Sequence, residues 1–485
     1  MRKVSKSLAS LLALLALASC TSKEKAPETK VNPDGSTSVV YNNSASGGDG
    51  FKLRDYEEKT LPNGLRILFI PDQSLPYVSL QMLVRGGASQ DPEAQSGLAS
   101  FVAELLDKGT AKRSAPQIAN DLGQLGAAFD ASASEDFTMI TASALSMQAE
   151  PLLQNFVEII TQPAFSNAEI ERMRKQIQAQ IARRVDSPGA FAAVAFADFL
   201  YGSHPYARPN SGTPKTVSGI KKKHLIQTYI RYFRPNNSIL AVVGKYTPEY
   251  AKKIEESFGA WQKRDVPAPT YPQIPPIEGV QIRLVDKAGL VQSQIRMGHL
   301  GIKRQNEDFI ALRMANTILG GAFASRLNSR IRKDLGLTYG VSSQFDARMD
   351  SGPFEISTFT KNESTGQLIS ETLKLLKEYK ENGATSKEVE TVRGYLKGIF
   401  PTAIETPEKL AMNLLLLRLH GIPDTYLTQY LREVDRLSTS DVNRVVKKYI
   451  DDKNLKIVVF SSAPAVQKQL EAIGKVEVKK ASDYQ

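Results

Sequence analysis

A sequence pattern that occurs twice limits how this chain of 485 residues can fold. In each copy two glutamates flank an aliphatic residue, an arginine follows, and an acid-Ser/Thr-Pro triplet comes later. The first copy consists of Glu169-Ile170-Glu171, Arg174 and Asp186-Ser187-Pro188, and the second of Glu388-Val389-Glu390, Arg393 and Glu405-Thr406-Pro407. All matching positions are 388 − 169 = 219 residues apart. A constant offset across both motifs indicates an internal duplication and predicts two similar domains.

Both copies mix strand patterns with amphipathic helix patterns. Asn63-Gly64 lies next to an apolar run and is typical of a tight β-hairpin, because both residues tolerate positive φ angles. Strands are expected at 79–85 and 137–142, and helices at 97–106 and 151–160. A capping box predicts a further helix start after Ser166, and Thr385 occupies the same place in the second copy. The order of elements predicts an α+β fold.

Five prolines interrupt the chain between the two copies. They are Pro267, Pro269, Pro272, Pro275 and Pro276. Proline removes a backbone donor and breaks both helices and sheets, so this stretch is typical of an interdomain linker. We therefore expect an N-terminal domain at 51–265, a linker at 266–279, a C-terminal domain at 280–475 and a tail at 476–485.

The start of the chain has the pattern of an exported protein. A basic start followed by a short apolar run predicts a secretory signal peptide at 1–19. The tetrad Leu17-Ala18-Ser19-Cys20 resembles a bacterial lipobox, which implies cleavage before Cys20 and acylation of that residue. Residues 20–50 contain little apolar surface, so a flexible tether is expected there. The chain is then expected in the bacterial cell envelope, lipid-anchored. Thr21 rather than Asp follows the cysteine, which by analogy with Gram-negative lipoproteins favours the periplasmic side of the outer membrane.

The charge of the chain allows several kinds of partner. The net charge of +11 becomes 11 − 3 = +8 without the three basic residues of the signal peptide. A basic protein can bind anionic lipid or nucleic acid. Nucleic-acid binding calls for a basic face with interleaved aromatic residues. The tight basic run Lys221-Lys222-Lys223 is instead typical of a solvated helix face, so no nucleic-acid partner is expected.

Two further motifs have counterparts in a known family. Residues 97–110 read GLASFVAELLDKGT, and residues 319–327 read LGGAFASRL. Together with the duplication, they resemble the pitrilysin/insulinase family of zinc peptidases, over about residues 51 to 475. The resemblance implies two homologous pitrilysin-like domains, each a mostly antiparallel sheet with packed helices. It also implies an enclosing chamber for peptide substrates.

The zinc-binding groups of that family are replaced in this chain. Active members carry H-x-x-E-H in this helix, in which two histidines bind zinc and the glutamate acts on the metal-bound water. A glutamate from a later helix is the third ligand. The corresponding residues are Ser100, Ala103, Glu104 and Gln180. A catalytic zinc ion needs three protein ligands and an open position for water, so we expect no metal and no cofactor on this chain.

The histidines of the chain offer no replacement for these ligands. There are four, namely His204, His224, His299 and His420. No two of them are paired at a metal-ligand spacing, and each is expected to be an ordinary surface or core histidine. The hypothesis that the chain is itself an active zinc peptidase would therefore require stoichiometric zinc in the pure protein.

A second constellation of the family is kept. The family's C-terminal half supplies an arginine and, seven residues later, a tyrosine just past a helix end. Here these are Arg332 and Tyr339, with Gly336 suited to end the helix. By resemblance, both would donate hydrogen bonds to the scissile carbonyl oxygen as it becomes an oxyanion. By spacing alone, they are a solvated helical arginine and a strand aromatic.

Residues 130–132 also allow two interpretations. Their counterpart in the family is a strand edge that pairs with an extended substrate peptide. In this chain the segment, which leads into the strand expected at 137–142, can equally be an ordinary edge strand.

The first functional hypothesis is a non-zinc subunit of a heteromeric pitrilysin-like metallopeptidase. A separate chain with H-x-x-E-H would bring the zinc and the general base. This chain would form half of the chamber and supply Arg332 and Tyr339. The alternative is a catalytically inactive structural or peptide-binding envelope lipoprotein of the same fold. The two differ in whether a partner with the zinc motif co-purifies.

Overall fold

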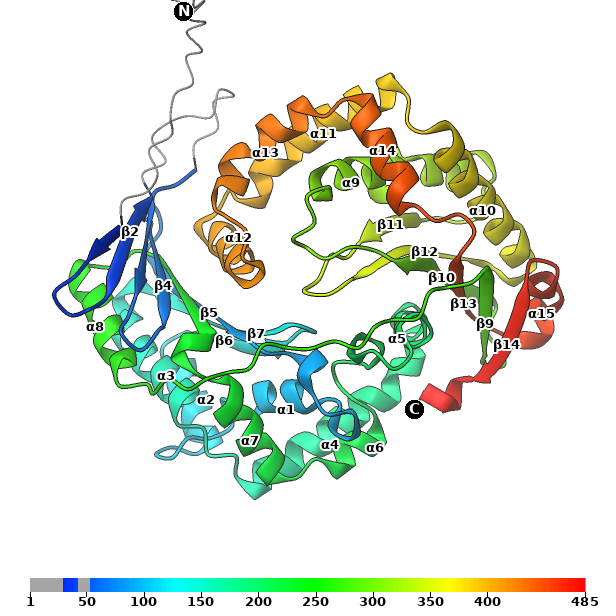
Figure 1. Cartoon of the computed structure of the whole chain (residues 1–485). Coiled ribbons are helices and arrows are strands. Elements are labelled where there is room, and N and C mark those ends of the chain that lie inside the picture. Colours follow the sequence, from blue (N-terminus) through cyan, green and yellow to red (C-terminus); the bar gives the residue numbers. More distant parts are fainter. Residues whose placement is uncertain (1–28, 42–52, 485) are drawn as a thin grey trace, which may run out of the picture.

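The computed structural model describes residues 29–41 and 53–484, which form two sheets with surrounding helices (Figure 1). The strands and helices of the N-terminal half are β1 (Thr29–Val31), β2 (Thr37–Tyr41), β3 (Tyr56–Thr60), β4 (Arg66–Pro71), β5 (Tyr77–Arg85), α1 (Leu98–Leu105), α2 (Ala115–Gln124), β6 (Ala128–Ala133), β7 (Phe137–Leu145), α3 (Ala149–Thr161), α4 (Asn167–Arg183), α5 (Pro188–Tyr201), α6 (Pro214–Gly219), α7 (Lys222–Tyr232), β8 (Ser238–Gly244) and α8 (Pro248–Gly259). Those of the C-terminal half are β9 (Val280–Asp286), β10 (Gln292–Leu300), α9 (Phe309–Asn316), the π-helical turns η7 (Thr317–Gly321) and η8 (Asn328–Asp334), β11 (Val341–Phe345), β12 (Pro353–Lys361), α10 (Thr365–Asn382), α11 (Ser386–Ala403), α12 (Pro407–His420), α13 (Thr425–Arg436), α14 (Thr439–Tyr449), β13 (Leu455–Ser461), α15 (Ala463–Glu471) and β14 (Lys475–Lys480).

The two sheets share the same central strand order. The first runs β1-β2-β3-β4-β8-β5-β7-β6 and the second β11-β12-β10-β13-β9-β14. Five neighbouring strands of the first sheet, β4-β8-β5-β7-β6, therefore correspond one for one to β9-β13-β10-β12-β11. In each set the first pair is parallel and the other three are antiparallel. The predicted duplication and the α+β fold with two mostly antiparallel sheets are confirmed.

Local sequence signals account for several element boundaries. Gly64 has a φ of +87°, and the Asn63 side chain accepts the N–H of Leu65 at 3.1 Å, so the predicted hairpin turn joins β3 and β4. The Oγ of Ser166 accepts the N–H of Glu169 at 3.3 Å and caps α4. These short-range contacts involve only neighbouring residues, which explains why the sequence predicts them.

The repeated arginine has the same role in both halves. Arg174 donates to the carbonyl of Ile220 at 2.8 Å, just after α6 ends. Its counterpart Arg393 donates to the carbonyls of Asp435 at 2.7 Å and Leu437 at 2.9 Å, where α13 ends. The last carbonyls of a helix have no partner within it. The duplicated arginine therefore satisfies helix-end carbonyls in each half.

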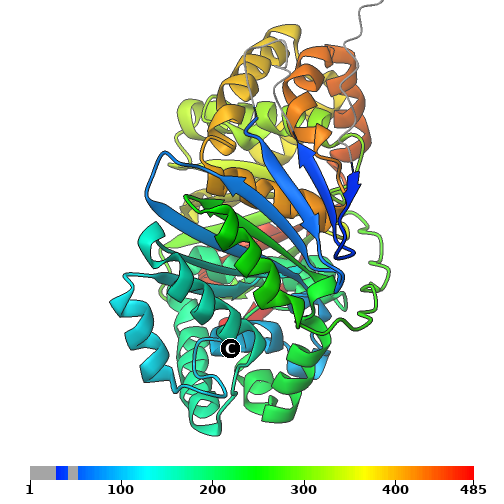
Figure 2. The same ribbon diagram turned by 90° about the vertical axis from the view of Figure 1, so that its left-hand side faces the viewer.

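Helices α5 and α12 connect the two halves. Their first residues are 407 − 188 = 219 positions apart, and each packs on the sheet of the other half, α12 on β8 and β5 and α5 on β13 and β10. Leu410 and Leu414 of α12 share a buried core with Ala241 of β8. The ring of Phe191 in α5 lies 4.4 Å from the ring of Phe460 in β13, measured between centroids. Each half thus completes the core of the other, and Figure 2 shows the orange helices of the C-terminal half above the blue strands of the N-terminal half.

A buried ion-pair cluster fixes α12 against the N-terminal sheet. Arg418 is 7% exposed and pairs with Glu58 of β3 at 2.7 Å and with Asp424. The hydroxyl of Tyr56 donates to Asp424 at 2.6 Å, and Arg85 donates to the carbonyl of Arg418 at 3.0 Å. Charges from both halves therefore neutralise one another at their interface.

The structure differs from the sequence expectation at both ends of the described chain. Residues 29–41, expected within the flexible tether, form the hairpin β1-β2, and β2 pairs with β3. The segment TSVVY of β2 is rich in β-branched residues, and its pairing with β3 outweighs the polar composition around it. Residues 475–480, at the border of the expected tail, form β14 beside β9. Within the described part of the chain, no helix is long and apolar enough to cross a membrane.

Candidate functional site

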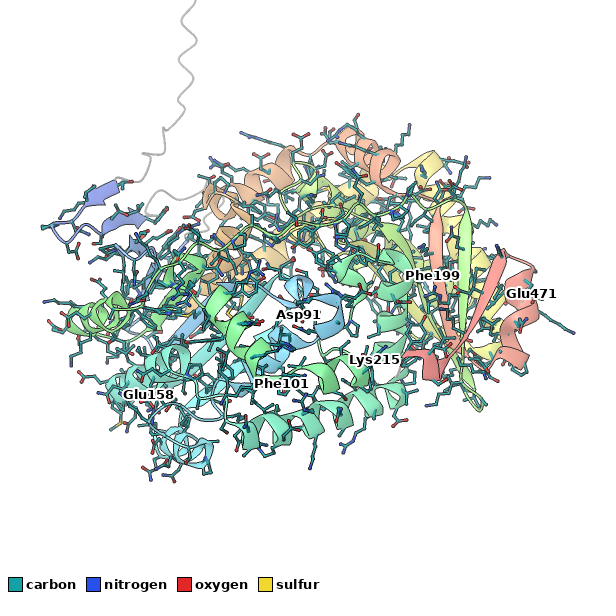
Figure 3. The ribbon with its side chains drawn as sticks, turned by 60° about the horizontal axis from the view of Figure 1, so that its bottom comes forward. Asp91, Phe101, Glu158, Phe199, Lys215 and Glu471 are labelled. Carbon is teal, nitrogen blue, oxygen red and sulfur yellow. The ribbon has the colours of Figure 1, made fainter. Side chains whose placement is uncertain are left out.

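Helix α1 carries three of the four positions that correspond to the zinc motif, and Asp91 holds its N-terminal end. One carboxylate oxygen of Asp91 accepts the N–H groups of Gly97 and Leu98 at 2.9 Å each, and the other accepts that of Ala99 at 3.0 Å. These N–H groups have no partner within the helix. Burial raises the pKa of Asp91 to about 7, while the three donors act in the opposite direction. Figure 3 labels Asp91 together with Phe101 of α1.

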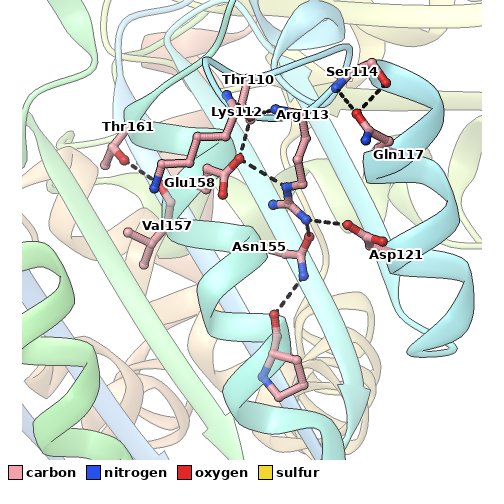
Figure 4. A network of polar contacts seen from close by, with 11 residues as sticks. Thr110, Lys112, Arg113, Ser114, Gln117, Asp121, Asn155, Val157, Glu158 and Thr161 are labelled. Atoms are coloured by element: carbon pink, nitrogen blue, oxygen red, sulfur yellow. Dashed lines mark hydrogen bonds and ion pairs between the residues drawn. The ribbon is translucent and has the colours of Figure 1, made fainter.

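A polar network holds the segment that follows α1 (Figure 4). Thr110 donates to Glu158 at 2.5 Å and accepts the N–H of Arg113 at 3.0 Å. The Arg113 guanidinium donates to Glu158 at 3.1 Å and to Asn155 at 2.7 Å, both on α3. It also donates to Asp121 of α2 at 2.6 Å. The N-terminal end of α1 and the segment that follows the helix are therefore held by contacts that involve no metal.

The four positions of the zinc motif do not form a zinc site. The hydroxyl of Ser100 donates to the carbonyl of Asn210 at 2.8 Å, and Ala103 is buried and has no ligating atom. Glu104 is half-buried, and burial raises its pKa. Gln180 is exposed on α4. Among the described residues, no group of three His, Cys, Asp or Glu could hold a metal ion. The residues present do not fit the zinc ion of active family members.

The buried histidines are held by backbone contacts or by packing, and Nε2 of His204 also lies 3.4 Å from a carboxylate oxygen of Asp350. Nδ1 of His204 accepts the N–H of Tyr206 at 3.1 Å, and Nε2 of His299 accepts the N–H of Asp451 at 3.1 Å. His420 is 8% exposed, and its burial lowers its pKa to about 4. These environments favour neutral, structural imidazoles.

Metal analysis of the purified protein is expected to give far less than one zinc ion per chain. The zinc content is expected to rise to about one ion per chain in a variant that combines Ser100→His, Ala103→Glu, Glu104→His and Gln180→Glu. Three protein ligands suffice for a catalytic zinc site, and α1 packs against α4. The measurement is elemental mass spectrometry after dialysis, with Gln180→Glu alone as the control. One zinc per unmodified chain would contradict the assignment.

Arg332 and Tyr339 line one hollow of about 410 Å³ in the C-terminal half. It lies between η8, the start of β11, and one face of β10 and β12. The structure therefore brings together the two residues that the sequence singled out. The other lining residues are Gln294, Arg296, Phe323, Asn328, Gly340, Val341, Ser342, Ser357, Thr358 and Phe359. None of the lining residues is acidic.

The backbone brings the pair together through a turn at Gly336. Arg332 lies in the last turn of η8, and Gly336 then adopts a φ of +62°, so the helical segment ends as predicted. Tyr339 follows before β11 begins, and it is 85% exposed. Arg332 has no carboxylate partner among the described residues, and its Cζ lies 4.6 Å from the ring centroid of Phe323. The motif at 319–327 marks this segment in the sequence, but nothing there indicates that Phe323 contacts Arg332.

Residues 130–132 lie in β6, at the edge of the first sheet. This strand pairs with β7 on one side and has no other strand neighbour in the described part of the chain. Asp130 and Ser132 are exposed. Pairing of this edge with a peptide stays a prediction.

Comparison with known sequences gives a family for each half. The profile described as "Insulinase (Peptidase family M16)" matches residues 66–209. The profile described as "Peptidase M16 inactive domain" matches residues 219–396. The two matches together cover most of both sheets.

Individual relatives and solved structures agree with these matches. Two similar proteins are described as uncharacterized zinc proteases. The one from Bacillus subtilis is 25% identical, and the match covers 82% of this chain and 97% of that protein. The one from Mycobacterium tuberculosis is 26% identical, and the match covers 80% of this chain and 89% of that protein. The structure of a peptidase M16 inactive domain from Pseudomonas fluorescens has a TM-score of 0.78 and 26% identity, covering 85% of this chain and 99% of that one. A Helicobacter pylori protease, at 22% identity and a TM-score of 0.77, covers 84% and 100% and shares the fold. This chain belongs to the pitrilysin/insulinase family, peptidase family M16, as a member without the family's zinc ligands.

Proposed function

We propose that this chain is the non-zinc subunit of a heteromeric pitrilysin-like metallopeptidase. A partner with H-x-x-E-H carries the zinc ion and the general base. This chain forms half of the chamber that encloses the peptide, and it supplies Arg332 and Tyr339 to the partner's zinc site. There both donate hydrogen bonds to the oxyanion that forms from the scissile carbonyl.

The observation that carries the proposal is the shared hollow of Arg332 and Tyr339 on a chain whose described residues offer no zinc site. Tyr339 is 85% exposed and Phe323, on the same hollow, is 77% exposed. Large aromatic side chains exposed together are typical of a surface that a partner or ligand covers. Among the described residues Arg332 is free of carboxylates, so its donors are available to an incoming oxygen. Both groups act by hydrogen bonding and need no metal on their own chain.

Co-expression with an H-x-x-E-H chain from the same organism tests the proposal. The two chains are expected to co-purify, with zinc on the partner, and to cleave peptides together much faster than either chain alone. Co-purification without any peptidase activity, or failure of every such chain to bind, would contradict it. The alternative, a structural or peptide-binding lipoprotein of the same fold, would then take its place.

We also propose that the chain is lipid-anchored at Cys20 in the bacterial envelope, on the periplasmic side of the outer membrane. The support is the lipobox-like tetrad and the basic, apolar segment before it. The first described strand begins at Thr29, only 29 − 20 = 9 residues later. At 3.3 to 3.6 Å per residue, the connection spans at most about 30 Å, so the anchor keeps the first sheet close to the membrane.

Metabolic labelling with a fatty acid tests the anchor. The wild-type chain is expected to incorporate the label and to fractionate with membranes. Cys20→Ala is expected to do neither, while Ser22→Ala serves as the matched control. Label on the Cys20→Ala chain would contradict the assignment.

A further inference from the structure

We propose that Phe323 is a positioning residue that holds the Arg332 guanidinium in place over the hollow it shares with Tyr339. The inference rests on the proposed function and names a further residue on which that function depends. Phe323 is in the loop between the two π-helical turns η7 and η8 and acts only through Arg332.

The contact is a stacking of a cation on an aromatic ring. The Cζ of Arg332 is 4.6 Å from the centroid of the Phe323 ring, within the roughly 6 Å over which such pairs attract. In the part of the chain that the structure describes, Arg332 has neither a hydrogen-bonded carboxylate nor an ion pair. The ring is therefore the group that restricts the arginine side chain, whose free rotation would otherwise lower the population of any one geometry.

Stacking suits an arginine that must donate to a substrate. The N–H groups of a guanidinium lie in its plane, whereas an aromatic ring stacked on it covers its face. The Cζ of Arg332 lies over the Phe323 ring. A carboxylate partner would occupy these donors. An aromatic partner fixes the group and leaves the donors free for the oxyanion. This explains physically why an exposed phenylalanine, and no acidic residue, lines the hollow beside Arg332.

The loop that carries Phe323 is itself fixed in place. The amide of Asn328 donates to the carbonyl of Val341 at 2.9 Å and reaches the carbonyl of Ala322 at 3.4 Å. It also approaches the hydroxyl of Ser325 at 3.3 Å. At Gly320 in η7, just before the loop, a Cβ atom would lie 2.7 Å from the backbone nitrogen of Ser343 in β11, so η7 and this strand pack closely. Asn328, which lies in η8 with Arg332, therefore connects this π-helical turn to the loop that carries Phe323 and to β11.

Kinetics of the two-chain peptidase tests the inference. Phe323→Leu keeps the apolar bulk and removes the ring, so kcat is expected to fall roughly 3- to 30-fold with little change in KM. Phe323→Tyr keeps the ring, so this variant is expected to retain the wild-type kcat. Adding Phe323→Leu to Arg332→Ala is expected to cost nothing further, because the ring acts through the arginine. Ile399→Ala, at an exposed position on α11, is the control.

The outcomes separate this inference from the proposed function. If Arg332→Ala lowers kcat and Phe323→Leu does not, the positioning role is wrong and the proposed function stands. If Arg332→Ala has no effect, both fail. Nuclear magnetic resonance of the full chain alone gives a second readout. The Nε–H signal of Arg332, identified by its loss in Arg332→Lys, is expected to shift in Phe323→Leu and not in Phe323→Tyr. An unshifted signal in Phe323→Leu overturns the stacking.

Discussion

Replacing Arg332 by alanine in the two-chain peptidase is expected to lower kcat by about 100- to 1,000-fold, the usual cost of removing one donor to an oxyanion. KM is expected to change little, because the donor interacts more strongly with the oxyanion than with the ground-state carbonyl. Tyr339→Phe removes only a hydroxyl and is expected to produce a loss of the same order. The measurement is steady-state cleavage of a fluorogenic peptide by the purified complex.

Matched controls separate chemistry from assembly. Lys333→Ala removes a neighbouring exposed cation, and Tyr395→Phe removes a hydroxyl from an exposed tyrosine on α11. Both are expected to leave kcat unchanged. Size-exclusion chromatography must show intact complex for every variant. Unchanged kcat in Arg332→Ala and Tyr339→Phe would remove this chain from the chemistry and leave it a role in the chamber or as a scaffold.

The sequence predicts the fold well because its strongest signals are local or repeated. Asn63-Gly64 forms its turn with its own neighbours, and the 219-residue offset reproduces the same helices in both halves. The sequence does not predict that α5 and α12 each pack on the sheet of the opposite half. The sequence of α5, PGAFAAVAFADFLY, is apolar on almost every side, which predicts burial but does not say which sheet covers it. That choice depends on contacts between residues far apart in the chain.

Only part of the candidate site can be predicted from the sequence. The resemblance to the family singles out Arg332 and Tyr339 by their spacing, and Gly336 ends the helix between them. Phe323 could not be found in that way, since its contact with Arg332 depends on how a loop folds back between two π-helical turns. Such turns are rare and leave no simple periodic signal. The sequence does not predict the hairpin β1-β2 for a related reason, because the stability of this hairpin comes from pairing with β3.

Arg418→Met is expected to lower the free energy of unfolding by about 3 kcal/mol. Removing one member of a buried ion pair typically costs about 3 to 5 kcal/mol, because the remaining charge is left buried without compensation. The lower end applies here because Arg66 also pairs with Glu58 and Tyr56 donates to Asp424. Urea denaturation followed by circular dichroism measures the change. Arg436→Met, at an exposed pair with Glu433, is the control and is expected to stay within about 1 kcal/mol.

The same variant tests whether the two halves unfold as one unit. Trp261, the single tryptophan of the chain, follows α8 in the N-terminal half, whereas circular dichroism reports on helices in both halves. Because α5 and α12 each complete the core of the opposite half, the two probes are expected to give coincident transitions. Arg418→Met removes charge pairing at the interface and keeps both apolar faces, so the transitions are expected to shift together. Separate transitions in the wild type would mean that α5 and α12 do not make the two halves unfold together. The chain would then behave as two domains joined by a linker.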